Sequence, residues 1–202
     1  MVDFKLIRIH DSSSLLYAVA EKIWKESFPE CERRDAATER LCVDTDSRFF
    51  FNAVVKGNDV EDLKSDLSEA SGFLPEMNGR QVVGMFTWWR LEGMVYGEHF
   101  AMSPSVRGKG IGEAVFRSVT SGFQDEGLPF VFEVETPDPS APITIRRAAF
   151  YSRCGMYLLD YPYFQPKYHP CDTPVPMRLM SSSPNVDSSL VAEKIRSVYP
   201  VF

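Results

Sequence analysis

Hydrophobic and polar residues alternate in several short stretches of the chain, and this alternation has the period of a half-buried β-strand. Strands are predicted at residues 4–9, 49–55, 81–89, 95–102, 130–135, 156–164 and 175–180. Only a short turn at Glu92 and Gly93 separates the third stretch from the fourth, which is typical of an antiparallel hairpin. We therefore expect a sheet with a meander at its middle.

Between these strands the hydrophobic residues recur every three or four positions, which is the period of an amphipathic helix. The first such run begins at Leu15, and Asp11 or Ser12 is its expected N-cap. A glycine, Gly155, follows a later run and is expected to close it in the left-handed conformation. Further helices are predicted at residues 32–42, 111–123, 143–154 and 185–198. Strands alternating with helices predict an α/β fold.

A single domain is expected over residues 1–202, because about 100 to 200 residues is the usual size of a domain and no segment repeats. Residues 57–79 are rich in Asp, Ser, Asn and Glu and poor in large apolar side chains, so we interpret them as an insertion loop. The apolar spacing in residues 185–198 predicts a C-terminal helix that packs back on the domain.

The charge balance, 22 basic against 28 acidic residues, gives a formal net charge of −6 and a pI near 5.2. A domain that grips nucleic acid over a broad face carries the opposite sign, so no nucleic-acid partner is expected. No apolar stretch approaches the roughly 20 residues that span a bilayer, and the N-terminal segment lacks a secretory apolar run. The expectation is a cytoplasmic protein without a membrane segment.

Four cysteines and three histidines lie far apart in the sequence without a C-x-x-C pair, so no metal site is expected.

The most informative stretch follows a predicted strand and opens directly into a predicted helix; it reads Arg107-Gly108-Lys109-Gly110-Ile111-Gly112. Glycines let the backbone approach a ligand closely, the N–H groups of a first helical turn attract anions, and two cations add positive charge. We expect a phosphate-binding site here. The spacing of a Walker A loop is not met, and the dinucleotide fingerprint has Glu113 in place of its third glycine.

This loop resembles the pyrophosphate loop of the Gcn5-related N-acetyltransferases, the GNAT family, which reads [QR]-x-x-G-x-[GA] after the fourth strand. A second signature of that family, an aromatic pair on a helix that a glycine closes, is similar to residues 148–156. The order of elements from Phe4 to about Met180 fits as well. The resemblance implies an α/β, single-domain, GNAT-like fold with a mixed, mostly antiparallel central sheet flanked by helices.

The resemblance also implies an enzyme, an acyl-CoA-dependent N-acetyltransferase that moves acetyl from acetyl-CoA directly to an amine, with no metal. Main-chain groups of the fourth strand would hold and polarise the thioester, and the glycine loop would bind the pyrophosphate. The cofactor-binding residues on this basis are Phe100, Ala101, Met102, Arg107, Gly108, Lys109, Gly110, Ile111 and Gly112.

Acetyl transfer needs a general base that takes a proton from the amine. Alternation places Glu133 and Glu135 on one face of a predicted central strand, where a carboxylate is costly unless it faces a cleft. Glu133 is the first candidate and also matches an acid that related enzymes use; Glu98 is the second, and which of them is the base stays open. Tyr151 matches the family's acid for the leaving thiolate, whereas His99 is expected to be structural.

The acceptor is less well defined, a primary amine of a small molecule or a peptide. The family shapes its acceptor site with the first helices and late strands, here Trp24, Phe28, Glu30, Glu32, Arg33, Tyr161 and Tyr163. An alternative function is a non-catalytic acyl-CoA-binding or sensor module of the same fold, and a more distant one is a nucleotide-dependent oxidoreductase that binds NAD(P)H. A monomer and a homodimer are both compatible with the sequence.

Overall fold

The computed structural model describes residues 4–56 and 81–200 of the chain; the expected insertion at 57–79 lies outside them. The elements are β1 (Phe4–Ile9), α1 (Leu15–Ser27), η1 (Glu30–Glu32), α2 (Ala36–Thr45), β2 (Phe49–Lys56), β3 (Gln81–Leu91), β4 (Met94–Met102), η2 (Pro104–Val106), α4 (Ile111–Asp125), β5 (Phe130–Glu135), α5 (Pro142–Arg153), β6 (Tyr157–Leu158), β7 (Tyr163–Gln165), β8 (Val175–Ser181) and α6 (Ser188–Arg196). The predicted α/β fold with a mixed sheet is confirmed.

The eight strands follow the order β1-β2-β3-β4-β5-β8-β6, and β7 also pairs with β8. β1 runs antiparallel to β2, and β5 runs antiparallel to β8. The pairing of β4 with β5 is parallel and covers only Val95–Gly97 on β4, although β4 itself continues to Met102. This parallel pair, together with the antiparallel pairs, makes the sheet mixed.

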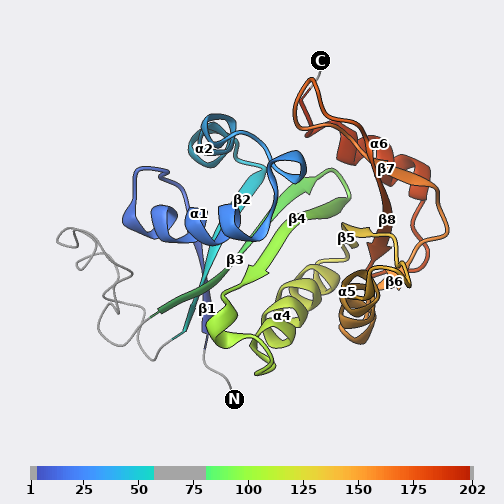
Figure 1. Ribbon diagram of the computed structural model, residues 1–202, viewed down its shortest axis with the longest axis horizontal. Helices are drawn as coiled ribbons and strands as arrows, with labels where there is room; N and C mark the ends of the chain where they lie inside the picture. The colour runs from blue at the N-terminus through green and yellow to red at the C-terminus, as the bar shows by residue number, and fades with distance from the viewer. Residues whose placement is uncertain (1–3, 57–80, 201–202) are drawn as a thin grey trace. The chain divides into compact units, whose positions relative to one another are not determined.

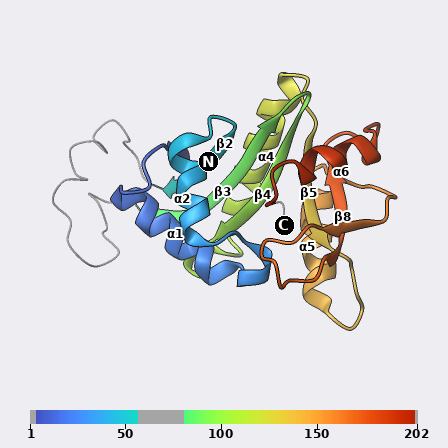
Figure 2. The ribbon, with the colours of Figure 1, turned by 90° about the horizontal axis from the view of Figure 1, so that it is seen from above.

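The described residues divide into two compact units, and the first contains residues 4–30, 35–56, 81–88 and 99–115. In this unit α1 and α2 lie side by side, and Arg40 of α2 reaches Glu21 of α1 at 3.0 Å (Figures 1 and 2). Both helices contact β2. Trp24 of α1 and Phe51 of β2 are fully buried. Burial of such aromatic side chains stabilises the unit.

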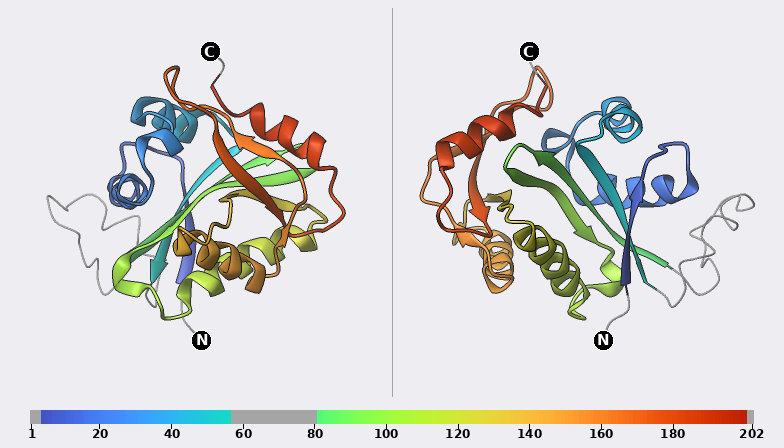
Figure 3. Two further views of the ribbon diagram at one scale, coloured as in Figure 1. Left: turned by 45° about the vertical axis from the view of Figure 1, so that its right-hand side comes forward. Right: turned by 180° about the vertical axis from the view of Figure 1, so that it is seen from behind.

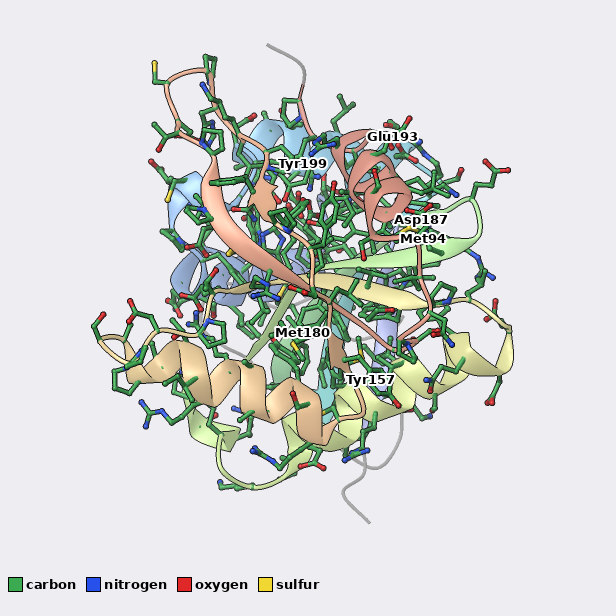
Figure 4. The ribbon with its side chains drawn as sticks, turned by 90° about the vertical axis from the view of Figure 1, so that its right-hand side faces the viewer. Met94, Tyr157, Met180, Asp187, Glu193 and Tyr199 are labelled. Atoms are coloured by element: carbon green, nitrogen blue, oxygen red, sulfur yellow. The ribbon has the colours of Figure 1, made fainter. Side chains whose placement is uncertain are left out.

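The second unit contains residues 31–34, 89–98 and 116–202. Helices α4 and α5 lie on one side of its strands and α6 on the other (Figures 3 and 4). Between the helices and β5 the core is aromatic: Phe116 of α4 packs edge-on against Phe130 and Phe132 at ring distances of 6.0 and 5.5 Å. β6, β7 and β5 all pair with β8, which makes β8 the central strand of this unit.

Helix starts differ from the sequence expectation in two places. The cap of α1 is Ser14, whose side chain accepts from the Tyr17 N–H; Asp11 instead accepts from Ser13 in the preceding turn, so the expected cap was wrong. The second helix begins at Ala36 behind the cap Asp35, not at residue 32. The charged residues before it form the short 3₁₀ turn η1 and the segment that follows.

The strand expected over 156–164 is two short strands, β6 and β7. Pro162 lies between them, and a proline cannot donate to a ladder, so the pairing breaks there. The C-terminal helix is confirmed with narrower bounds, Ser188–Arg196. Gly155 has φ of +91°, as expected for a left-handed cap. None of the helices within residues 4–56 and 81–200 is long and apolar enough to span a membrane.

We expect Gly84→Ala to lower the free energy of unfolding by about 1–3 kcal/mol, because a Cβ on Gly84 would lie 2.6 Å from the main-chain oxygen of Ala101. The matched control is Gly122→Ala on α4, where nothing lies within 4 Å and alanine favours the helix by up to about 1 kcal/mol. Urea unfolding of both variants measures the difference, and equal stabilities would contradict the close packing of β3 on β4.

Candidate functional site

The glycine loop connects the end of β4, through η2, to the start of α4 in the first unit. Gly108 and Gly110 have φ values of +74° and +76°, a region that residues with a Cβ rarely adopt. A Cβ built on either glycine would meet no atom within 4 Å. The need for glycine therefore comes from the backbone conformation, and the space around the loop is open to a ligand.

Both cations of the loop are tied to nearby main chain. Arg107 donates through Nε to the Met102 oxygen at 2.9 Å, and Lys109 donates through Nζ to the Ser105 oxygen at 3.0 Å. The Ala114 N–H donates to the Gly110 oxygen at 3.1 Å and marks the first turn of α4. The loop is thus held in shape, and the partial positive charge of the helix start lies beside it.

The three β4 residues predicted to hold the thioester lie next to this loop. A Cβ atom built on Gly112 would lie 3.2 Å from the Met102 side chain and 3.8 Å from the Phe100 side chain. These three residues are therefore packed together. The side chains of Ala101 and Met102 are both buried. The structure therefore brings the sequence-predicted cofactor residues together in the first unit, from Phe100 to Gly112.

Glu133 of β5 lies in the second unit, and four side chains donate hydrogen bonds to its carboxylate. Tyr96 and Tyr199 donate to Oε2 at 2.9 and 2.8 Å, Gln165 donates through Nε2 to Oε2 at 2.9 Å, and Tyr163 donates to Oε1. Burial raises the pKa of Glu133, and these hydrogen bonds oppose the rise. The pattern is that of a buried carboxylate surrounded by neutral donors.

Glu98 of β4 has a different environment in the same unit. Arg34 Nη2 lies 2.6 Å from Glu98 Oε1, and their side chains are 2% and 0% exposed. Trp89 donates through Nε1 to Oε2 at 3.1 Å, and the Arg34 guanidinium lies 5.0 Å from the Trp89 ring. A buried ion pair with these added contacts neutralises the charge of Glu98.

A short chain of tyrosine hydroxyls connects the two carboxylates. The Tyr168 hydroxyl lies 3.0 Å from Glu98 Oε1 and 3.1 Å from the Tyr199 hydroxyl, and Tyr199 in turn donates to Glu133. Sequence reasoning identified both glutamates but missed Arg34, Tyr96, Tyr168 and Tyr199 as their partners. The sequence offered only a general signal for these partners: a buried carboxylate is costly without hydrogen-bond donors, so donors were to be expected near each glutamate.

Tyr151 of α5 lies in a cluster of aromatic rings. Its ring centroid is 4.3 Å from Phe132 and 5.1 Å from Phe116. Within the described residues its hydroxyl makes no hydrogen bond, so it does not belong to the tyrosine chain around Glu133. Burial raises the pKa of Tyr151 to about 12, with Arg147 opposing the rise. The phenol therefore keeps its proton at neutral pH.

The residues proposed to shape the acceptor site have varied environments. Trp24 is fully buried and packs edge-on with His99 at 5.9 Å, so it is part of the core of the first unit. His99 also faces Thr87 Oγ1 at 3.4 Å, as expected for a structural histidine. Glu32, in the second unit, has a pKa raised by burial and by Glu135. Tyr163 is a partner of Glu133.

Comparison with known proteins agrees with this geometry. The family profile described as "Acetyltransferase (GNAT) family" matches residues 15–156. Among solved structures, a Bacteroides thetaiotaomicron protein assigned to the GNAT family as an acetyltransferase has a TM-score of 0.75 and 28% identity, with 100% of both chains covered. No curated protein sequence matches the chain.

Two more distant structures share the fold. Arabidopsis thaliana NAA60 in complex with acetyl-CoA has a TM-score of 0.56 and 14% identity, covering 89% of this chain and 97% of its own. A spermidine N-acetyltransferase SpeG chimera from Vibrio cholerae and hSSAT has a TM-score of 0.54 and 12% identity, covering 88% of this chain and 93% of its own. The match to the family profile defines an acetyltransferase class. The chain belongs to the GNAT family.

The environment of Glu98 predicts a large effect on stability. We expect Glu98→Gln to lower the free energy of unfolding by about 3 kcal/mol, because it leaves the Arg34 charge buried without its counter-charge. The control is Glu126→Gln, which breaks the exposed pair with Arg90 and should cost less than about 1 kcal/mol. Chemical denaturation measures both, and similar small losses would show that the Arg34–Glu98 pair is not a buried ion pair in solution.

Proposed function

We propose that this protein is an acetyl-CoA-dependent N-acetyltransferase that moves the acetyl group to a primary amine of a small molecule or a peptide. The observation that carries the proposal is the glycine loop at the start of α4, with two left-handed glycines and open space around them. Such a loop binds a pyrophosphate through main-chain N–H groups. Membership of the GNAT family supports acetyl transfer.

The residues from Phe100 to Gly112 fit the donor, acetyl-CoA. The loop and the first turn of α4 would bind its pyrophosphate, with Lys109 close enough to add charge. The main chain of β4 at Phe100, Ala101 and Met102 would hold the pantetheine arm and polarise the thioester, because this part of β4 lies beyond the ladder with β5. The complex of NAA60 with acetyl-CoA supports this donor.

Glu133 is the better candidate for the general base, and Glu98 is the weaker one. Glu98 is already paired with the Arg34 cation in a buried pair, whereas the hydrogen-bond partners of Glu133 among the described residues are neutral donors. A carboxylate whose pKa is raised by burial binds the proton of an ammonium group more readily. Because the base must be deprotonated before it acts, kcat/KM should fall as the pH drops through the raised pKa of Glu133.

Tyr151 is the proposed acid for the leaving thiolate. Its pKa of about 12 keeps the phenol protonated at neutral pH, as an acid requires. The thiol of a leaving group has a pKa near about 8.5, so complete transfer from this phenol is uphill. Tyr151 would therefore act chiefly by donating a hydrogen bond to the sulfur as negative charge develops on it. This role requires only its hydroxyl.

Binding of the donor to the loop is tested by thermal unfolding with acetyl-CoA, ATP and NADPH in parallel. Acetyl-CoA at 100 times its dissociation constant should stabilise the protein by about 2.7 kcal/mol. Gly110→Glu should abolish this shift, since the new carboxylate repels the pyrophosphate. The control Gly127→Glu has the same kind of backbone strain, φ +74° with nothing within 4 Å, away from the loop.

Gly127→Glu should keep the acetyl-CoA shift. A shift with NADPH in place of acetyl-CoA would favour the oxidoreductase alternative, and loss of the shift in both glycine variants would mean that strain, not the ligand site, explains the effect.

The transfer itself is measured as release of the CoA thiol with a panel of primary amines. We expect Tyr151→Phe to lower kcat by about tenfold or more with little change in KM for acetyl-CoA, because the lost hydroxyl acts in the transition state. The control is Tyr157→Phe, an exposed tyrosine on β6. Equal kcat values for wild type and Tyr151→Phe would remove Tyr151 from the mechanism.

Tight binding of acetyl-CoA without thiol release from any amine would favour the alternative, a non-catalytic acyl-CoA sensor with the same fold.

A further inference from the structure

Tyr199 lies beyond α6, and its hydroxyl meets three other oxygens of the second unit. Figure 4 labels Tyr199 beside α6, the helix marked by Asp187 and Glu193. The Tyr199 hydroxyl lies 2.8 Å from Glu133 Oε2, 3.0 Å from the Tyr96 hydroxyl and 3.1 Å from the Tyr168 hydroxyl. Tyr199 is 5% exposed. This residue is therefore a buried junction of the hydroxyl chain.

Two hydrogen bonds of this junction follow one another from donor to acceptor, from Tyr168 to Tyr199 and from Tyr199 to Glu133. A hydroxyl has one hydrogen, and that of Tyr199 goes to Glu133, so its oxygen is available to accept. Tyr168 donates to it, and the chain runs from Tyr168 through Tyr199 to the carboxylate. A donor that itself accepts a hydrogen bond donates more strongly. Tyr168 thereby strengthens the bond that Tyr199 makes to Glu133.

The second acceptor near Tyr168 is Glu98, at 3.0 Å from its hydroxyl. Glu98 and Tyr199 compete for the single hydrogen of Tyr168. Arg34 and Trp89 already donate to Glu98, which makes Glu98 a weaker acceptor for that hydrogen. The Tyr168 hydrogen is therefore shared between Glu98 Oε1 at 3.0 Å and the Tyr199 oxygen at 3.1 Å, and the bonds from Arg34 and Trp89 reduce the share that Glu98 takes. The two carboxylates are coupled through two phenols, although only one of them has a cationic partner among the contacts described.

We infer that Tyr199 is a positioning residue that directs one hydrogen bond onto the Glu133 carboxylate, supported from behind by Tyr168 and the Arg34–Glu98 pair. The inference rests on the proposed role of Glu133 as the base that accepts the amine's proton. Tyr199 does not touch the reacting atoms itself. Its hydrogen bond to Oε2 fixes the orientation of the carboxylate. The other oxygen, Oε1, has Tyr163 as its phenol partner.

The titratable and charged groups around Glu133 come from several elements. Tyr96 of β4, Tyr163 of β7 and Tyr199 contact Glu133, Tyr168 contacts Tyr199 and Glu98, and Arg34 pairs with Glu98. Burial raises the pKa of Tyr163, and the charge of Arg196 of α6 opposes that rise. Burial raises the pKa of Tyr96 and Tyr199, so both phenols keep their hydrogens through the range in which a carboxyl group titrates. Of Glu133 and these two phenols, Glu133 is then the group whose protonation changes in that range.

The test is to titrate the Glu133 carboxyl directly by NMR, in the unliganded full chain labelled with ¹³C at the glutamate carboxyl carbons. Glu133→Gln assigns the resonance by removing it. Loss of a hydrogen bond to the charged form raises the pKa of its acceptor, so Tyr199→Phe should raise the pKa of Glu133 by about one unit. Tyr168→Phe should raise it by a smaller amount, because this change acts through Tyr199.

The matched control is Tyr17→Phe, which removes the hydroxyl of a buried tyrosine beside Glu21 in the first unit. It should leave the Glu133 titration unchanged even if it lowers stability as much as Tyr199→Phe does. An unchanged titration in Tyr199→Phe would overturn the inference. An unchanged titration in Tyr168→Phe, with a shift in Tyr199→Phe, would overturn the coupling to Glu98.

Activity supplies a separate readout. In an active enzyme, the acid side of the kcat/KM profile should move to higher pH in Tyr199→Phe by the same amount as the NMR titration, about tenfold in rate at a fixed pH on that side. If the wild type releases no thiol with any amine, the proposed function fails. The NMR shift still tests whether the Tyr199 hydrogen bond lowers the pKa of Glu133. The two failures are therefore distinguishable.

Discussion

The second unit depends on one constraint, the burial of the Glu133 carboxylate. A charge removed from water requires hydrogen-bond donors in place of the water it loses. These donors come from β4, from β7 and from the segment after α6, so the carboxylate connects elements that are distant in sequence. The positions of β7 and of the chain after α6 are consequently restricted by the need to place their polar groups at one point.

Two carboxylates in one hydrogen-bonded network differ because their neighbours differ. Glu98 faces a guanidinium, and its charge is compensated within the fold. Glu133 faces phenols and an amide, which support an anion but add no positive charge, and burial raises its pKa. The electrostatic environment, more than the position on a strand, thus separates the proposed base Glu133 from the ion-paired Glu98.

The sequence predicted those features that depend on local patterns. The glycine loop, the hairpin turn at Glu92 and Gly93, and the left-handed Gly155 follow from residue types at short spacing, and the structure contains all of them. The α1 cap was misplaced because Asp11 and Ser14 both suit a cap, and only the backbone geometry selects Ser14. The residue types alone do not distinguish between these two positions.

The partners of Glu98 and Glu133 could not be read from local patterns. Arg34 lies 64 residues from Glu98, and Tyr199 lies 66 residues from Glu133. Periodicity shows that a glutamate on β5 points inward but contains no information about which distant phenol meets it. The choice between the two candidate bases therefore depends on tertiary contacts, and sequence reasoning left it open.

The interleaving of the two units has a consequence for folding during synthesis. All residues of the first unit have been made once Val115 has been added, whereas the second unit draws on residues up to and including Tyr199. Segments 31–34 and 89–98 are made early but belong to the later unit. Domains tend to fold in the order in which they leave the ribosome. The buried network that joins Arg34, Glu98 and Glu133 can close only after Tyr199 has been made, which is later than every residue of the first unit.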